Sequence, residues 1–183
     1  MQIKRLCNFN PVIFSIPIIF LALSSGCAGT KAGTKTLQPI DQGITLTDYD
    51  NLQIKTEISK GVGISQIQAD RIANYVVTQL KEKDPDCFKS ISNHCEALST
   101  LLVIINFTRY DEGSAFARSM LAGLGQMHID AIVSISDKAS DKILAKHEVT
   151  KTFAWGGIYG GSTTIEDIEP AFAKAVVNII LQE

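Results

Sequence analysis

The sequence has little of what acid–base, nucleophilic or metal chemistry requires. Its 183 residues include three histidines and four cysteines, and none of the histidines, His94, His128 and His147, stands in a recognisable nucleophile motif. The pair His128 and Asp130 is interpreted as solvated surface of a strand rather than as an acid–base pair. We therefore expect no catalytic residue, no metal and no cofactor, and predict that the protein is not an enzyme.

An excess of positive charge is also missing. Lys and Arg number 17 against 19 Asp and Glu, which gives a net charge of −2. No general attraction to nucleic acid follows from that balance. Hydrophobic residues nevertheless make up 45% and charged residues 20%, a composition that excludes a wholly disordered chain and predicts a globular domain.

No apolar run has the roughly 20 residues that a membrane-spanning helix needs. The longest, from Val12 to Leu23, covers about a dozen residues and follows Lys4 and Arg5. Small residues come directly after it. This order of basic, apolar and small residues is typical of a secretion signal, which we predict over residues 1–26.

Cys27 closes the sequence Leu23-Ser24-Ser25-Gly26-Cys27, which resembles the lipobox of bacterial lipoproteins. In those proteins the cysteine is acylated and becomes the first residue after cleavage. The resemblance implies that Cys27 is the site of lipid attachment, with the protein held to the cell envelope by its acyl chains. Ala28 stands where an aspartate would signal retention in the inner membrane, so we expect the outer membrane and a periplasmic domain. An ordinary signal peptide that contains a cysteine is the alternative.

Residues 27–47 are rich in Gly, Thr and Lys and predict a flexible lipidated tether. The folded domain is then expected over residues 48–183. Within it, Cys87 and Cys95 are the remaining cysteines. In an oxidising periplasm they predict a disulfide, with free thiols, or a metal site that includes His94, as the alternatives.

Hydrophobic periodicity predicts one α/β (α+β) domain with the order β-α-β-β-β-β-α. Alternation of apolar and polar residues predicts strands over residues 49–58, 127–136 and 143–153. A strongly apolar, β-branched run predicts a central strand over 101–110, and a short strand is expected over 87–91. Helical spacing predicts a helix capped by Ser65 and a last helix that begins near residues 163–167. We expect a mainly antiparallel, mixed sheet of about five strands with two helices on one face.

The stretch from Phe107 to Leu144 resembles a widespread family of bacterial lipoproteins that is classed only as a domain of unknown function. The family has a tyrosine strand, a loop with an arginine followed by glycines, and a strand that ends in an aspartate before a Thr-Gly-Lys turn. The matching residues here are Tyr110, Gly113, Arg118, Gly123, Gly125 and Asp137. The turn reads Ser140-Asp141-Lys142 and so lacks the glycine. The resemblance implies a fold similar to the envelope lipoprotein of curli secretion and to the N-terminal domain of TolB, and it implies no catalytic residue.

The loop between Gly113 and Gly125 is more apolar than a solvated connection. It carries four large apolar side chains around one arginine: Phe116, Arg118, Met120, Leu121 and Leu124. The loop either packs as a helical turn over the sheet edge or forms an interaction surface. We expect partial burial, with Phe116 or Leu121 packed and Arg118 reaching the sheet edge. The glycine-rich run 156–163 lacks the lysine of a phosphate-binding loop and is interpreted as a linker.

Taken together, these features predict a non-enzymatic module for protein interaction or assembly, anchored to the envelope by lipid. Its expected partners are the membrane, through the anchor, and an envelope protein or a second copy of the chain. The alternative is a periplasmic module that binds a small ligand at the open face of the sheet.

Overall fold

The computed structural model follows the predicted periodicity. It describes residues 32–92, 97, 99–121 and 124–183. The strands are β1 (Gly33–Gln38), β2 (Asn51–Ile58), β3 (Ser90–Ser92), β4 (Thr100–Asp111), β5 (Met127–Asp137) and β6 (Lys142–Phe153). The helices are α1 (Gln66–Lys83), α2 (Ala115–Met120), α3 (Gly157–Ser162) and α4 (Glu169–Ile180), with a 3-10 turn, η1, at Leu46–Asp48.

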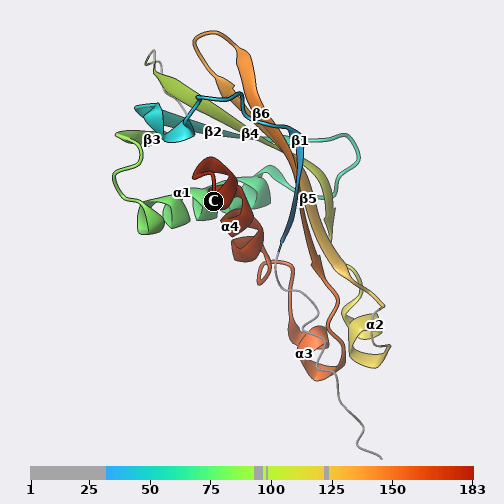
Figure 1. Ribbon diagram of the computed structural model, residues 1–183. Coiled ribbons are helices and arrows are strands. Elements are labelled where there is room, and N and C mark those ends of the chain that lie inside the picture. Colours follow the sequence, from blue (N-terminus) through green and yellow to red (C-terminus); the bar gives the residue numbers. More distant parts are fainter. Residues whose placement is uncertain (1–31, 93–96, 98, 122–123) are drawn as a thin grey trace, which may run out of the picture.

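The strands form one mixed sheet in the order β1-β6-β5-β4-β2-β3. Neighbours β4, β5, β6 and β1 pair antiparallel, whereas β2 runs parallel to both β4 and β3. This confirms the predicted α+β class. The long strands reach away from the body of the domain, and α2 and α3 lie together at their far end (Figure 1). We call this end the tip and define it as residues 113–121, 124–125 and 154–163.

The core lies between one face of the sheet and the helices α1 and α4. Ile129, Ala131, Val133 and Ile135 of β5 are fully buried there, and the residues between them are half-buried. Helix α1 begins where Ser65 and Gln68 form a capping box, as the sequence predicts. The two faces of the sheet therefore differ as the alternation indicates.

The other face of the sheet points away from this core. Leu102, Ile104 and Ile132 lie on it and are half-buried. Lys55 stands beside Ile104 in the neighbouring strand, and Glu148 stands opposite Ile132. An aliphatic strip with charged neighbours thus runs across this face, and we call Leu102, Ile104 and Ile132 the open-face strip.

The predicted tether was wrong for part of its length. Residues Gly33–Gln38 form β1, which pairs with β6 from Thr150 to Lys146. All six side chains of β1 are exposed, because an edge strand of this kind is held by backbone hydrogen bonds and needs no apolar alternation. The described fold thus includes residues well before the predicted boundary at 48, whereas Cys27 lies outside the described residues.

The predicted linker at residues 156–163 was also wrong, since it contains α3. The last helix begins later than predicted, at Glu169, and places Pro170 in its first turn, where proline is tolerated. Within the described part of the chain, no helix is both long and apolar enough to cross a membrane.

Candidate functional site

A buried arginine holds the tip together. Arg118 is 3% exposed, and its Nε donates to the carbonyl oxygen of Gly160 at 2.8 Å. Its Nη1 donates to the carbonyl oxygens of Glu112 and Gly125, both at 2.8 Å, and Nη2 donates to that of Thr163 at 3.2 Å. The planar guanidinium satisfies carbonyls from two loops that are far apart in sequence. The side chain therefore joins the β4–β5 connection to the β6–α4 connection.

Glycines let α2 and α3 approach this closely. A Cβ atom on Gly161 of α3 would lie 2.9 Å from the Cβ of Ser119 in α2. Gly125 has a φ of +69°, and a Cβ there would lie 2.9 Å from the Cβ of Ala117. Both positions exclude larger residues. Gly125 and Arg118, two residues of the family pattern, therefore both contribute to the packing of α2 within the tip.

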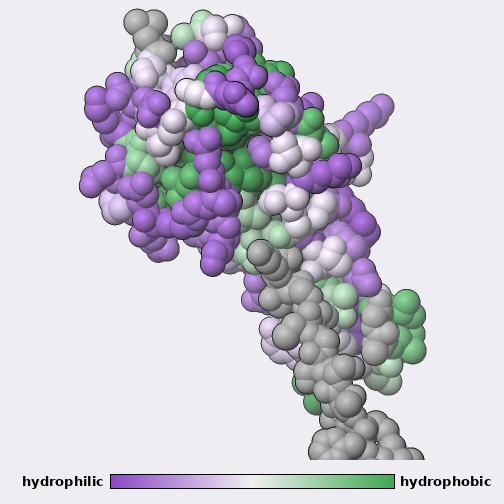
Figure 2. Space-filling model, viewed as in Figure 1, coloured by the Kyte–Doolittle hydropathy of each residue, from purple (hydrophilic) through white to green (hydrophobic). Residues whose placement is uncertain are grey.

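Large apolar side chains lie around Arg118 and its hydrogen bonds and are exposed to solvent. Their exposed fractions range from 38% for Trp155 to 92% for Ile158. We call this set the tip patch: Phe116, Met120, Leu121, Leu124, Trp155, Ile158 and Tyr159. Figure 2 shows hydrophobic surface at the end of the molecule where Figure 1 places α2 and α3. The ring of Tyr159 packs edge-on against that of Trp155, with 5.9 Å between centroids.

The expected burial of this loop was wrong in its details. Phe116 and Leu121 are both more than half exposed, and Arg118 is buried inside the tip instead of reaching the sheet edge. The reason is α3, which the glycine-rich sequence did not indicate. Arg118 and the small residues of α2 face α3, so the large side chains on the other sides of α2 remain uncovered.

Charge is almost absent from the tip. Residues 113–127 and 154–165 contain Arg118 as their single charged residue, and its guanidinium is buried against carbonyl groups. The chain as a whole has 20% charged residues. The exposed surface of the tip patch is therefore apolar and uncharged, unlike the open-face strip, which has charged neighbours.

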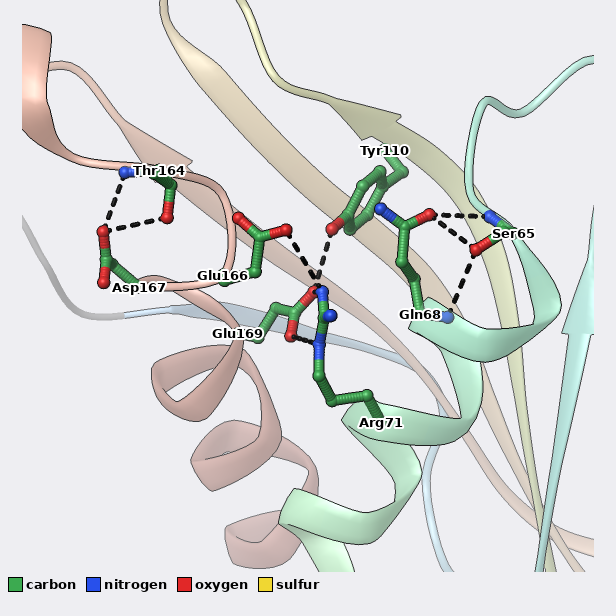
Figure 3. A network of polar contacts seen from close by, with 8 residues as sticks. All are labelled: Ser65, Gln68, Arg71, Tyr110, Thr164, Glu166, Asp167 and Glu169. Carbon is green, nitrogen blue, oxygen red and sulfur yellow. Dashed lines mark hydrogen bonds and ion pairs between the residues drawn. The ribbon is translucent and has the colours of Figure 1, made fainter.

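A second polar cluster lies where α1, α4 and β4 meet (Figure 3). Glu169 is fully buried and accepts hydrogen bonds from Arg71 Nε at 2.7 Å, Arg71 Nη2 at 2.8 Å and the Tyr110 hydroxyl at 2.8 Å. The hydrogen bond to Glu169 raises the pKa of Arg71, and burial raises the pKa of Tyr110. The buried carboxylate of Glu169 is paired with Arg71, which gives Tyr110 of the family pattern a structural role. Sequence reasoning missed Glu169, whose only signal is an acid at the start of an apolar helix.

His128 and Asp130 lie on the open face of β5 and are half-buried. His128 Nδ1 is 3.1 Å from the Thr152 hydroxyl. Burial lowers the pKa of His128 and raises the pKa of Asp130, so both groups favour their neutral forms.

The other predicted site residues are only partly described. Cys87 is half-buried and forms no disulfide with any residue that the structure describes, and burial raises its pKa. Cys95, like Cys27, lies outside the described residues, so the disulfide stays a prediction. Over the described ranges, no three His, Cys, Asp or Glu side chains come together as metal ligands would.

A groove of about 500 Å³ runs between β1 and α4. Its walls include Ala32, which precedes β1, Thr34 of β1, Lys174 and Asn178 of α4, and Glu183 after that helix. It lies on the helix side of the sheet, not on the open face where a small ligand was expected.

The sequence that forms most of this α+β domain matches a known protein family. The chain belongs to a family classed as a domain of unknown function, DUF4410, whose family model matches residues 41–157. The match includes the whole family pattern from Tyr110 to Lys142 and confirms the resemblance. None of the curated proteins matches the sequence.

Solved structures share the fold at low sequence identity. The PelC dodecamer from Paraburkholderia phytofirmans matches with a TM-score of 0.53 and 10% identity, over 82% of this chain and 97% of that chain. A DUF330 protein from Xanthomonas campestris matches with a TM-score of 0.45 and 14% identity, over 81% and 88%. At 10% identity the likeness to PelC is one of fold alone.

Proposed function

We propose that this protein is a non-enzymatic lipoprotein of the cell envelope whose domain is an assembly module. Acylated Cys27 holds it in the outer membrane, and the domain faces the periplasm. The observation that carries the proposal is the open-face strip, an aliphatic surface that the described fold leaves half-exposed. Soluble monomers rarely keep such surfaces without a use in contact.

The polar groups of the domain support binding rather than catalysis. The guanidinium of Arg118 and the carboxylate of Glu169 are buried and are used to join secondary structure elements. A catalytic site needs groups that are free to meet a substrate. The most prominent surface of the described fold is instead apolar and held rigidly by Arg118.

The partner that we propose for the domain is another copy of the chain, bound at the open-face strip. Leu102, Ile104 and Ile132 have charged neighbours in Lys55 and Glu148, and an apolar centre with a polar rim is the usual composition of a protein interface. PelC, a protein of similar fold, forms a dodecamer, which supports self-association without fixing its geometry.

The proposed assembly is tested with the full-length acylated protein in mild detergent. We expect mass photometry to detect oligomers of the wild type at micromolar concentration. The double variant Ile104→Thr/Ile132→Thr removes two of the three aliphatic side chains of the open-face strip but keeps β-branched residues in the strands. It should shift the protein to monomer.

The matched control is Ile67→Thr on α1, which changes an exposed isoleucine far from that strip and should leave the oligomers intact. A wild type that stays monomeric at every concentration tested contradicts the self-association. Oligomers that survive the double variant would place the contact elsewhere.

The lipid anchor has its own test. Cells fed an alkyne fatty acid should label the wild type, and Cys27→Ser should carry no label. Equal labelling of both proteins would exclude Cys27 as the site of acylation. Fractionation of the same cells should place the wild type with the outer membrane.

The groove between β1 and α4 favours one alternative, a module that binds a small ligand. Its walls offer the Lys174 ammonium and the Asn178 amide beside apolar Ala32, which is a combination suited to a small amphipathic acid. A fluorescent fatty acid probe that binds the wild type and not Lys174→Glu would support this function. Equal binding to both proteins would exclude the groove.

A further inference from the structure

We propose that the tip patch lies in the lipid leaflet that carries the acylated Cys27, so that the domain is seated on the membrane by a second, non-covalent contact. The inference rests on the lipid anchor of the proposed function and adds the partner of the tip. Three independent features of the molecule lead to it: where the chain enters the fold, which residues form the patch, and which residues the tip lacks.

The direction of β1 brings the lipid-carrying Cys27 close to the tip. Strand β1 starts at Gly33, which pairs with Thr150, and β6 continues from Thr150 to Phe153 and on to α3. Because β1 is antiparallel to β6, the chain traced backward from Gly33 heads toward the tip (Figure 1). Cys27 stands five residues before Ala32, and five residues span at most about 17 Å. The acyl chains are therefore confined to the tip end of the domain.

The composition of the patch suits a bilayer interface. Trp155 and Tyr159 are the amphipathic aromatic residues that favour the headgroup level. Phe116, Leu121 and Ile158 project beside them with more than half of their surface exposed. Short amphipathic elements of this kind enter the boundary between headgroups and acyl chains to a depth of roughly 5–10 Å.

The absence of exposed charged residues from the tip favours lipid over protein as its partner. Arg118 is the single charged residue of 113–127 and 154–165, and its buried hydrogen bonds spare it from desolvation by lipid. A protein interface has a rim of polar and charged side chains, which the open-face strip has and the tip does not. The two surfaces thus fit different partners, lipid at the tip and protein at the strip.

The fluorescence of Trp155 measures insertion of the tip into lipid directly, because Trp155 is the only tryptophan of the chain. The full-length protein, with acylation of Cys27 verified by mass spectrometry, is reconstituted into vesicles of phosphatidylethanolamine and phosphatidylglycerol with or without brominated phosphatidylcholine. Bromine atoms on the acyl chains quench only indoles that reach them. We expect the brominated vesicles to reduce Trp155 emission by about half or more, as insertion at the acyl boundary requires.

Two variants make the measurement specific. In Trp155→Phe/Ala139→Trp the indole moves to the β5–β6 hairpin, at the opposite end of β5 from the tip, and its emission should be the same in both kinds of vesicle. Ile158→Asp places a charge at the most exposed position of the patch and should reduce the quenching of Trp155 at least about twofold. Ile67→Asp, at an isoleucine of α1 that is 80% exposed, should not change it.

The outcomes separate the inference from the function on which it rests. An acylated protein whose Trp155 is not quenched overturns the seat in the membrane and leaves the anchor standing. If Trp155 is also protected from acrylamide in detergent without lipid, the tip is covered by a second copy instead, which overturns the inference as well. A protein without acyl chains on Cys27 fails earlier, at mass spectrometry, and refutes the proposed anchor itself.

Discussion

Arg118 donates from Nε to the carbonyl oxygen of Gly160 at 2.8 Å, across 42 residues of chain. This hydrogen bond and the three others that Arg118 donates hold two separate loops in a fixed arrangement. Side chains on a rigid support lose less conformational entropy when they bind than side chains on independent loops. The relationship thus explains how an exposed apolar patch can be ready for contact before any partner arrives.

Replacing this arginine should loosen the tip. Lysine has one nitrogen where arginine reaches four carbonyls, so Arg118→Lys leaves several buried carbonyls without donors. We expect the free energy of unfolding to fall by about 2–3 kcal/mol, measured by urea titration. Arg109→Lys, at an exposed ion pair with Asp111, should cost less than about 0.5 kcal/mol. Equal effects of the two variants would contradict the structural role of Arg118.

The patch itself should contribute little to stability. Leu121 is 52% exposed, so Leu121→Asp should change the free energy of unfolding by no more than about 0.5 kcal/mol. Leu144→Asp, at a buried leucine of β6, buries an unpaired carboxylate and should cost about 3 kcal/mol or more. Thermal unfolding in detergent checks both. A large loss in Leu121→Asp would mean that the side chain is buried within the domain.

A buried lysine should make stability depend on pH. Lys151 is 1% exposed, burial lowers its pKa, and its Nζ has no hydrogen-bond partner in the described part of the chain. Lys151→Met should therefore be about 1–2 kcal/mol more stable than the wild type at pH 7.

The direction of the pH effect follows from the lowered pKa of Lys151. The folded protein binds this proton less tightly than the unfolded chain does, so the wild type loses stability as the pH falls from the unfolded pKa toward the lowered pKa of the folded state, below which the loss is complete. Its deficit against Lys151→Met should disappear above the unfolded pKa of about 10.4. Denaturant titrations at pH 7 and at pH 10.5 test this. A difference that does not change with pH would exclude protonation of Lys151 as its cause.

The hairpin turn of this chain should be improved by the glycine that the family pattern has. Asp141 adopts a φ of +55°, which costs a residue with a side chain more than it costs glycine. Asp141→Gly should raise the free energy of unfolding by up to about 1 kcal/mol. The same change at Asp137, which accepts a hydrogen bond from the Ala139 amide at 2.8 Å, should lower it. The reverse order would contradict the strain at Asp141.

The sequence predicted those parts of the fold whose burial alternates. The strand residues Ile129 to Ile135 and the capped start of α1 at Ser65 follow local rules that a single sequence displays. Strand β1 and helix α3 do not, because β1 exposes all of its side chains and α3 is built from glycines that matter only against α2. Both are determined by contacts with distant segments.

The sequence likewise predicted only part of the candidate site. The apolar residues around Arg118 could be singled out from the sequence because their composition is unusual for a loop. Their exposure could not be predicted, since it depends on Gly160 and Thr163 accepting hydrogen bonds from Arg118. Ile158 and Tyr159 were missed altogether, because a linker was expected where α3 lies.

The central claim, assembly of envelope-anchored copies through the open face, is tested most directly in living cells. A photo-reactive amino acid at Ser134, which lies beside Ile104 on that face, should yield a dimer adduct in the membrane fraction after irradiation. The same amino acid at Ile67 on α1 should yield none. If acylated protein in that fraction forms no adduct with a second copy from Ser134, or forms it equally from Ile67, the account of the assembly is contradicted.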